Sequence, residues 1–308
     1  MDFEPSPTQR ALLDALGVLL SRRAGTGRSR ELAQRAAYDH ELEDALREGG
    51  FLDLYATEEA GPLGATLAVE RTAAELGAVT AVPHLLVSPA LGLGPGEGPT
   101  VLAVAGDTGP VRYGGTATRM LVAGADRCEV ARLDPTRAQP EPTVYGYPLA
   151  RVAAADRHEL GPGTAATMLA WWRVGLSAEA VGMMRRALDT TVEHARTRRV
   201  FGRALGSLQA LQHRLAELSV RVEGARWLVY EAAHLGAPPE AAAVAAAHTT
   251  AALHRLTRET HQLKGAVGLT VEDDLHLWTL RLQTLRAELG GLRAHRRAVS
   301  ESRWAATA

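Results

Sequence analysis

The segment RRVFGRALGSLQALQH, residues 198–213, joins two helical patterns through a glycine turn. A charged helix end precedes Gly202, and apolar positions recur every three or four residues from Leu208 onward, as expected for a new helix. Within a dozen residues the segment offers a guanidinium, an aromatic ring and an amide, which can hold a phosphate and a flat ring system. By itself, it is typical of a plain helix hairpin.

The residues on either side of this segment extend the helical pattern. Helices are expected over about 164–196, 207–235, 240–264 and 273–304. Glycine and proline clusters separate them at 161–163, 236–239 and 265–268. Four long helices with short connections indicate an antiparallel four-helix bundle.

The remaining chain divides into a helical part and a part rich in short apolar runs. Ser6-Pro7-Thr8-Gln9 is a capping box, and further helices are expected over about 39–48 and 67–76. A glycine and proline linker follows at 90–99, and then short runs that predict strands of a small antiparallel unit. We therefore expect an N-terminal α-helical domain over 1–88, a reduced middle β-domain over 89–163 and the bundle over 164–308.

Composition excludes several classes of function. The 34 basic and 35 acidic residues balance, so no nucleic-acid or membrane-surface partner is expected. No apolar run is long enough to span a bilayer, and the start lacks the pattern of a signal peptide. The single cysteine, Cys128, excludes an intramolecular disulfide framework, which favours a cytoplasmic protein.

Three other patterns do not support a site. The glycines at 92–98 depart from G-x-G-x-x-G at Glu97 and have no Lys-Ser/Thr, so they form a linker. Histidines 248, 254 and 261 are six and seven residues apart, whereas helical zinc pairs are three to five apart, so no metal site is expected. Ser177 lacks the last glycine of a nucleophile elbow.

Two motifs resemble those of the acyl-CoA dehydrogenase family. Arg198, Phe201 and Gly202 match its R-x-x-F-G segment, and Gln209 follows the phenylalanine at the family's separation of eight. QLKGAVG at 262–268 resembles Q-x-x-G-G-x-G, with Ala266 at the second glycine. The resemblance implies a mainly α fold with an N-terminal helical domain, a middle β-domain, here small or truncated, and a C-terminal four-helix bundle.

The resemblance also implies where FAD would be held. In the family, these two motifs reach the FAD of a neighbouring subunit and hold its pyrophosphate and adenine end. Cofactor contacts are accordingly expected from six residues: Arg198, Phe201, Gln209, Gln262, Gly265 and Ala266. The family's own flavin-ring segments, Thr-Glu-Pro, Gly-Ser-Asp and Trp-x-Thr, are not found in residues 89–163.

The catalytic glutamate of the family has no counterpart here. Its usual position, 27 residues after the glutamine of Q-x-x-G-G, is Leu289, and Arg296 matches the family's arginine seven residues later. The alternative position, 29 residues before the phenylalanine of R-x-x-F-G, is Trp172. Neither side chain can abstract a proton, so no catalytic residue is assigned.

Two nearby glutamates are candidate substitutes for this base. Glu288 precedes Leu289, and on a continuous helix one residue turns the side chain by about 100°, so it is expected to point away from the substrate. A local bulge would bring it back. Glu179, two turns beyond Trp172, is interpreted as a structural polar residue.

Two hypotheses follow. The first is a subunit of a heteromeric, FAD-dependent acyl-CoA dehydrogenase, in a heterotetramer whose second subunit supplies the glutamate and shares the FAD. Its substrate would be an acyl-CoA, of fatty acid or steroid catabolism, and its electron acceptor an electron-transfer flavoprotein or similar protein. The alternative is a self-sufficient homo-oligomer of the same fold, with non-redox or altered chemistry and another base such as Glu288.

Overall fold

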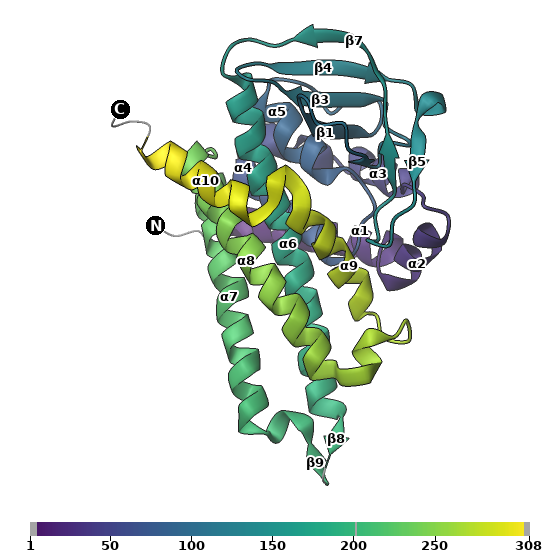
Figure 1. Cartoon of the computed structure of the whole chain (residues 1–308), viewed down its shortest axis with the longest axis vertical. Coiled ribbons are helices and arrows are strands. Elements are labelled where there is room, and N and C mark those ends of the chain that lie inside the picture. The colour runs from purple at the N-terminus through teal and green to yellow at the C-terminus, as the bar shows by residue number, and fades with distance from the viewer. Residues whose placement is uncertain (1–4, 201, 305–308) are drawn as a thin grey trace.

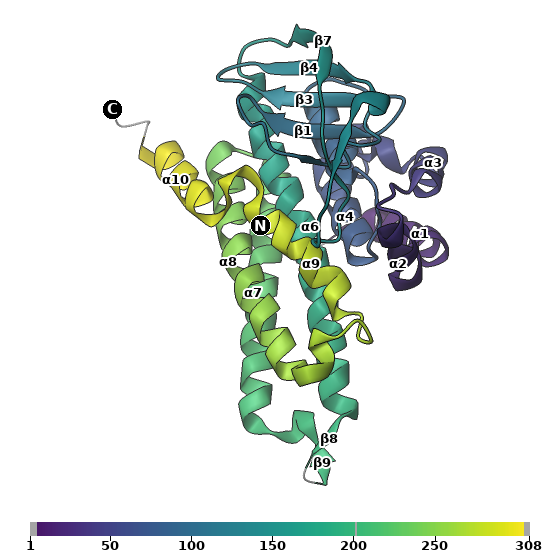
Figure 2. The same cartoon turned by 45° about the vertical axis from the view of Figure 1, so that its right-hand side comes forward.

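The computed structural model describes residues 5–200 and 202–304. A sheet lies at one end of the molecule, N-terminal helices lie beside it, and three long helices extend away from it to a hairpin at the other end (Figures 1 and 2). The arrangement confirms the predicted mainly α fold with a small sheet region and a C-terminal helical bundle.

The N-terminal part is helical. Its elements are α1 (Pro7–Arg23), α2 (Thr26–Gln34), α3 (His40–Glu48), η1 (Phe51–Ala56), α4 (Gly61–Ala74), η2 (Pro83–Val87) and α5 (Ser88–Ala90). The predicted capping box is confirmed, because the Gln9 N–H donates to Ser6 Oγ and the Ser6 N–H donates to Gln9 Oε1. Helix α2 was not predicted, and α4 begins at Gly61 rather than near Leu67.

The middle part contains two small sheets. Its strands are β1 (Thr100–Val104), β2 (Val111–Arg112), β3 (Arg119–Ala123), β4 (Cys128–Leu133), β5 (Gln139–Glu141), β6 (Leu149–Arg151) and β7 (Ala154–Glu159), with η3 (Pro135–Arg137). The first sheet has the order β1-β3-β4-β7 and the second β2-β6-β5. The expected all-antiparallel unit is wrong in one respect: β1 pairs with β3 in parallel. Strand β2, which lies between them in the sequence, belongs to the second sheet, so the chain re-enters the first sheet at β3 in the same direction as β1.

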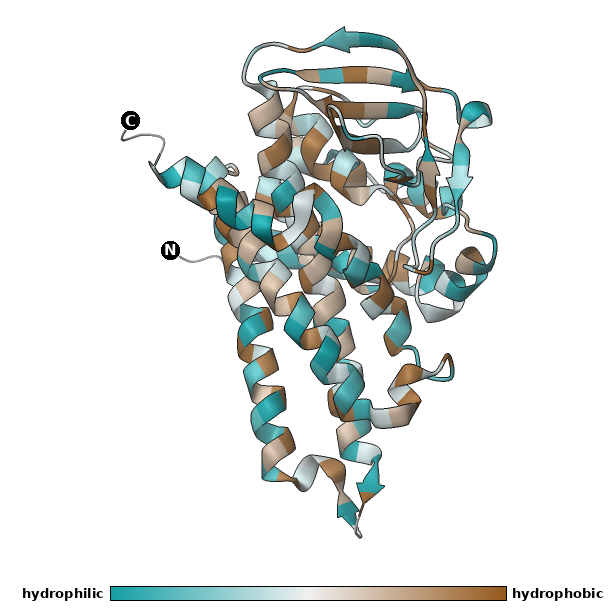
Figure 3. Ribbon diagram, in the orientation of Figure 1, coloured by the Kyte–Doolittle hydropathy of each residue, from teal (hydrophilic) through white to brown (hydrophobic). Residues whose placement is uncertain are grey.

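The C-terminal part is the bundle. Its elements are α6 (Thr164–Thr197), β8 (Arg199–Val200), β9 (Arg203–Ala204), η4 (Leu205–Ser207), α7 (Gln209–His234), α8 (Pro239–Lys264), η5 (Gly265–Leu269), α9 (Leu275–Ala287), η6 (Glu288–Gly290) and α10 (Gly291–Trp304). Teal and brown alternate along α7 and α8 in Figure 3, as expected for amphipathic helices with one buried face. Within the described residues, no helix is both long and apolar enough to cross a membrane.

Helix α6 runs through the centre and packs closely on α4. A Cβ atom added at Gly182 would lie 2.2 Å from the carbonyl oxygen of Glu70, so only glycine allows this backbone contact. Most of α6 between Ala165 and Leu188 is buried. The bundle and the N-terminal helices therefore share one hydrophobic core.

The fourth helix is broken, contrary to the prediction of one helix over 273–304. Leu289, Gly290 and Gly291 have φ values of 52°, 79° and 65°, three successive left-handed residues between α9 and α10. The two glycines adopt this conformation without steric cost, which makes a sharp turn possible there. The turn decides which side chains enter the site below.

Candidate functional site

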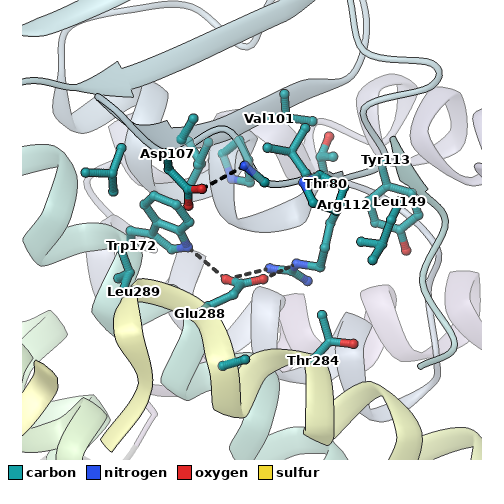
Figure 4. A pocket seen from close by; sticks show the side chains of 18 of the residues that line it. Thr80, Val101, Asp107, Arg112, Tyr113, Leu149, Trp172, Thr284, Glu288 and Leu289 are labelled. Carbon is teal, nitrogen blue, oxygen red and sulfur yellow. Dashed lines mark hydrogen bonds and ion pairs between the residues drawn. The ribbon is translucent and has the colours of Figure 1, made fainter. Parts of the chain in front are cut away.

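A cavity of about 590 Å³ lies where the N-terminal helices, the β1–β2 region and the bundle meet. Its apolar lining includes Pro83 on η2, Val101 and Leu102 on β1, and Leu169 on α6. Polar side chains on β2, α6 and the turn between α9 and α10 also line it, as Figure 4 shows. An apolar cavity with a few convergent polar groups is the usual form of a small-molecule site.

Arg112 on β2 holds two carboxylates at the floor of this cavity. Its Nη2 and Nη1 donate to Glu179 Oε2 and Oε1 at 3.0 and 3.3 Å. Its Nε forms an ion pair with Glu288 Oε1, and its Nη2 also lies 3.4 Å from Glu288 Oε2. The three side chains are only 16%, 8% and 15% exposed, so these are buried, charge-assisted hydrogen bonds.

Helix α6 contributes two members of this group from one face. Trp172 and Glu179 are seven residues apart, about two helical turns, and therefore project from the same side. The Trp172 Nε1–H donates to Glu288 Oε2 at 3.0 Å. In Figure 4 the Glu288 carboxylate lies between the indole and the guanidinium. Both oxygens of Glu288 are thus occupied.

Glu288 does not point away from the cavity, so the expectation from a continuous helix is wrong. Residues 288–290 form a separate turn with left-handed backbone at Leu289, and the 100° rotation between successive helical residues does not apply. Glu288 and Leu289 both line the cavity. The structure therefore has the local distortion that the sequence left as an open alternative.

The charged residues around the cavity floor balance one another. Burial raises the pKa of Glu179, and Arg112 opposes that rise. Burial lowers the pKa of Arg112, but Glu179 and Glu288 outweigh it and hold the value well above its usual range. A second guanidinium, Arg281, lies 5.1 Å from the Tyr147 ring, and Arg112 lies 4.8 Å from the same ring. Two arginines and two glutamates together carry no net charge.

A third carboxylate lies at the cavity in a different setting. Asp107 follows β1 on an exposed turn, and its Oδ1 accepts the Gly109 N–H at 2.8 Å. Among the described residues that line the cavity, Asp107, Glu179 and Glu288 are the only carboxylates. The two at the floor are both bound to Arg112. The cavity therefore offers no unengaged carboxylate at its floor.

The residues expected to contact a cofactor lie elsewhere, at the far end of the bundle. Arg198 is the C-cap of α6, Gln209 begins α7, Gln262 lies in the last turn of α8, and Gly265 and Ala266 begin η5. All five are exposed. Phe201 lies outside the described residues. Their roles stay predictions.

The two motif segments are neighbours at this end. The pKa of His194 on α6 is lowered by burial and by the charges of Lys264 and Arg198, which come from the two segments. Lys264 Nζ donates to Asp273 at 2.8 and 2.9 Å, and His261 Nδ1 lies 2.7 Å from the Gly268 carbonyl oxygen. These contacts fix the loop after α8.

The chemistry of this end fits a nucleotide phosphate. Arg198 forms no ion pair with an acidic side chain among residues 5–200 and 202–304, and the residue is exposed. Gly265 has φ 66° with nothing within 4 Å of a Cβ position, so a ligand can approach its backbone closely. A guanidinium without an ion-pair partner and an accessible backbone at the same end of the bundle are suitable donors to phosphate oxygens.

The two regions are far apart in the same chain. Arg198 lies 26 residues after Trp172 along α6, which at a rise of about 1.5 Å per residue is about 39 Å. A dinucleotide is shorter than this separation. Arg198 and its neighbours therefore lie beyond the reach of a dinucleotide bound in the chain's own cavity.

The sequence did not predict the role of Arg112, which binds both glutamates at the cavity floor. It lies on a strand of two residues and pairs with side chains 67 and 176 positions away. No spacing between neighbouring residues in the sequence predicts such distant contacts. The glycine pair at 290–291 was a usable signal for the turn that brings Glu288 to it.

Comparison with known proteins agrees with this architecture. Residues 160–302 match the family model described as acyl-CoA dehydrogenase, C-terminal domain. Acyl-CoA dehydrogenase IpdE2 of Mycobacterium tuberculosis is 38% identical over 154 residues, 49% of this chain and 44% of that protein. The chain spans about half or less of the length of the curated relatives it matches first.

Two solved structures are similar over nearly their whole length. The ChsE4-ChsE5 complex from Mycobacterium tuberculosis gives a TM-score of 0.83 at 21% identity, covering 100% of both chains. Butyryl-CoA dehydrogenase from Megasphaera elsdenii gives 0.83 at 20% identity, covering 98% of this chain and 99% of that one. At this identity the likeness shows the fold. Residues 160–302 are thus similar to the C-terminal domain of acyl-CoA dehydrogenases, and the described chain shares the fold of these solved structures.

Proposed function

We propose that this chain is a non-catalytic subunit of a heteromeric, FAD-dependent acyl-CoA dehydrogenase. The observation that carries the proposal is the arrangement of the cavity floor, where Arg112 binds both glutamates and Trp172 donates a hydrogen bond to Glu288. By the resemblance, Trp172 stands at one of the family's two base positions. Leu289 occupies the other. A carboxylate with both oxygens engaged is poorly placed to accept a proton from a substrate carbon.

The contribution of the chain to FAD would come from the far end of the bundle. FAD, when bound, supplies the hydride acceptor for α,β-dehydrogenation of an acyl-CoA. Arg198 would donate charge-assisted hydrogen bonds to its phosphate oxygens, and Gly265 and Ala266 would let the backbone approach it. Gln262 would add an amide, and Gln209 and Phe201 are proposed as further contacts with FAD. Because these groups are exposed and far from the cavity of this chain, the FAD they hold would be seated in another subunit.

The second subunit would supply what this cavity lacks. It would carry the flavin-ring contacts and a glutamate free to remove the α-proton. The similar ChsE4-ChsE5 structure is a complex, which supports a heteromeric arrangement. The similarity to IpdE2, which is named an acyl-CoA dehydrogenase, supports the class of reaction. We further propose that the complex is a cytoplasmic heterotetramer and that its electron acceptor is an electron-transfer flavoprotein. We also propose that the three domains of this chain span residues 1–88, 89–163 and 164–308.

Replacement of Arg198 by alanine tests the role in trans. In the co-expressed complex, loss of one charge-assisted hydrogen bond should weaken FAD by about 1–3 kcal/mol, or about 5- to 150-fold. Arg196→Ala is the matched control, because Arg196 is 74% exposed two residues earlier and approaches Glu193 at 4.0 Å. FAD affinity that falls equally in both variants, or in neither, would contradict the assignment.

A second candidate is a self-sufficient homo-oligomer in which Glu288 is the base. It is favoured by the turn at 288–290, which brings Glu288 into the cavity beside Leu289. Substrate binding would then have to release the carboxylate from Arg112. Glu288→Gln separates the two: loss of a general base lowers the rate by about 100-fold or more. A non-catalytic subunit would leave the activity of the complex within a few-fold.

A further inference from the structure

The ion pair between Arg112 and Glu288 occupies the polar end of an otherwise apolar cavity. We infer that this cavity is a binding site for an apolar ligand with a free carboxylate group, which takes the place of Glu288 on Arg112. The inference goes beyond the proposed function, because it concerns the cavity of this chain and not the FAD-binding end of the bundle.

Glu288 is the exchangeable partner of Arg112, and Glu179 is the fixed one. Glu179 projects from the middle of α6, a buried helix of 34 residues. Glu288 begins a three-residue turn at the junction of α9 and α10, which contains left-handed Leu289 and Gly290 and is followed by Gly291. Rotation about this short turn can withdraw one side chain without moving either helix axis.

The donors that Glu288 would vacate form a ready carboxylate site. Arg112 Nε and Nη2 and Trp172 Nε1 converge on the two Glu288 oxygens. A ligand carboxylate in that position would keep the floor neutral, since Arg112, Arg281 and Glu179 would otherwise carry one excess positive charge. A neutral amide can accept hydrogen bonds but cannot restore the charge, so a carboxylate is preferred.

The rest of the cavity fits the body of such a ligand. Pro83, Val101, Leu102 and Leu169 provide apolar walls, and the volume of about 590 Å³ is in the usual range for small-molecule sites. Burial of an alkyl chain against these side chains is favourable in proportion to its area. A medium-chain carboxylate combines the two features that the cavity offers.

The test measures binding of octanoate and octanamide to the full chain by calorimetry, in the assembly in which it is purified. Glu288→Ala should bind octanoate at least about tenfold tighter than the unaltered protein, or about 1.4 kcal/mol. Glu288→Gln should also bind octanoate more tightly than the unaltered protein, so this variant provides the test if Glu288→Ala does not fold. Octanamide affinity should change much less in both variants.

Glu141→Gln is the control, because Glu141 pairs with Arg151 at 2.6 Å but on the surface, with 37% and 48% of the side chains exposed. It should leave octanoate binding unchanged. Octanoate binding that is no tighter in either Glu288 variant would overturn the inference. An equal gain for octanamide would also overturn it, because it would show only that space had been made.

Discussion

Glutamine in place of Glu179 removes one negative charge from the cavity floor and keeps the shape of the side chain. The Glu179 side chain is 8% exposed and accepts two hydrogen bonds from Arg112, at 3.0 and 3.3 Å. The substitution converts a neutral group of two arginines and two glutamates into one with a net positive charge. The effect on stability is therefore electrostatic, with little change in packing.

The expected loss is about 3 kcal/mol in the free energy of unfolding. Removal of one partner of a buried ion pair costs about 3–5 kcal/mol, and the lower end applies because Arg112 keeps Glu288. The assay is equilibrium unfolding in urea at pH 7. The control, Glu141→Gln, breaks an exposed pair and should cost less than about 1 kcal/mol.

Equal stability of the two variants would refute the reasoning. It would mean that the Glu179 carboxylate is not an ionised partner of Arg112. The midpoint and the slope of the transition should be compared together, because a changed slope reports a changed unfolded or native ensemble rather than the pair itself.

The remaining predictions concern stability at other positions. His84 and His295 are buried with no hydrogen-bond partner in the described structure, and burial lowers the pKa of each from 6.5 to about 4. Below pH 6.5 the unfolded chain then binds protons that the folded chain does not, so the free energy of unfolding should be highest above pH 6.5 and fall toward pH 4, by at most about 3 kcal/mol per histidine. His84→Met or His295→Met should make this fall smaller. An unchanged pH profile in both variants would contradict the prediction. Gly182→Ala should destabilise the protein by about 2 kcal/mol or more in urea unfolding, because its Cβ would lie against the Glu70 carbonyl oxygen. The control, Gly27→Ala in α2, places its Cβ where no atom lies within 4 Å and should be neutral or slightly stabilising. Similar values for both variants would contradict the close packing of α4 and α6.

The helical framework could be predicted from sequence because its signals are local. Capping at Ser6, the periodic leucines after 208 and the glycine breaks fix helix ends within a few residues. Antiparallel helices with short turns also place Arg198 and Gln262 at one end of the bundle. These features depend on neighbours along the chain.

The cavity could not be predicted, because its contacts are not local. Arg112 meets Glu179 and Glu288 only after two sheets and the bundle have assembled. The parallel pairing of β1 and β3 likewise depends on where the two-residue strand β2 goes. The turn at 288–290 was signalled by Gly290 and Gly291, but helical periodicity on both sides favoured a continuous helix.

The FAD content of the purified chain tests the central claim most directly. The chain should be expressed alone and together with a second acyl-CoA dehydrogenase subunit, and FAD per polypeptide and acyl-CoA oxidation should be measured for both. The account predicts a colourless, inactive chain alone and an active complex with one FAD for each pair of unlike subunits. A yellow, active dehydrogenase composed of this chain alone would contradict it.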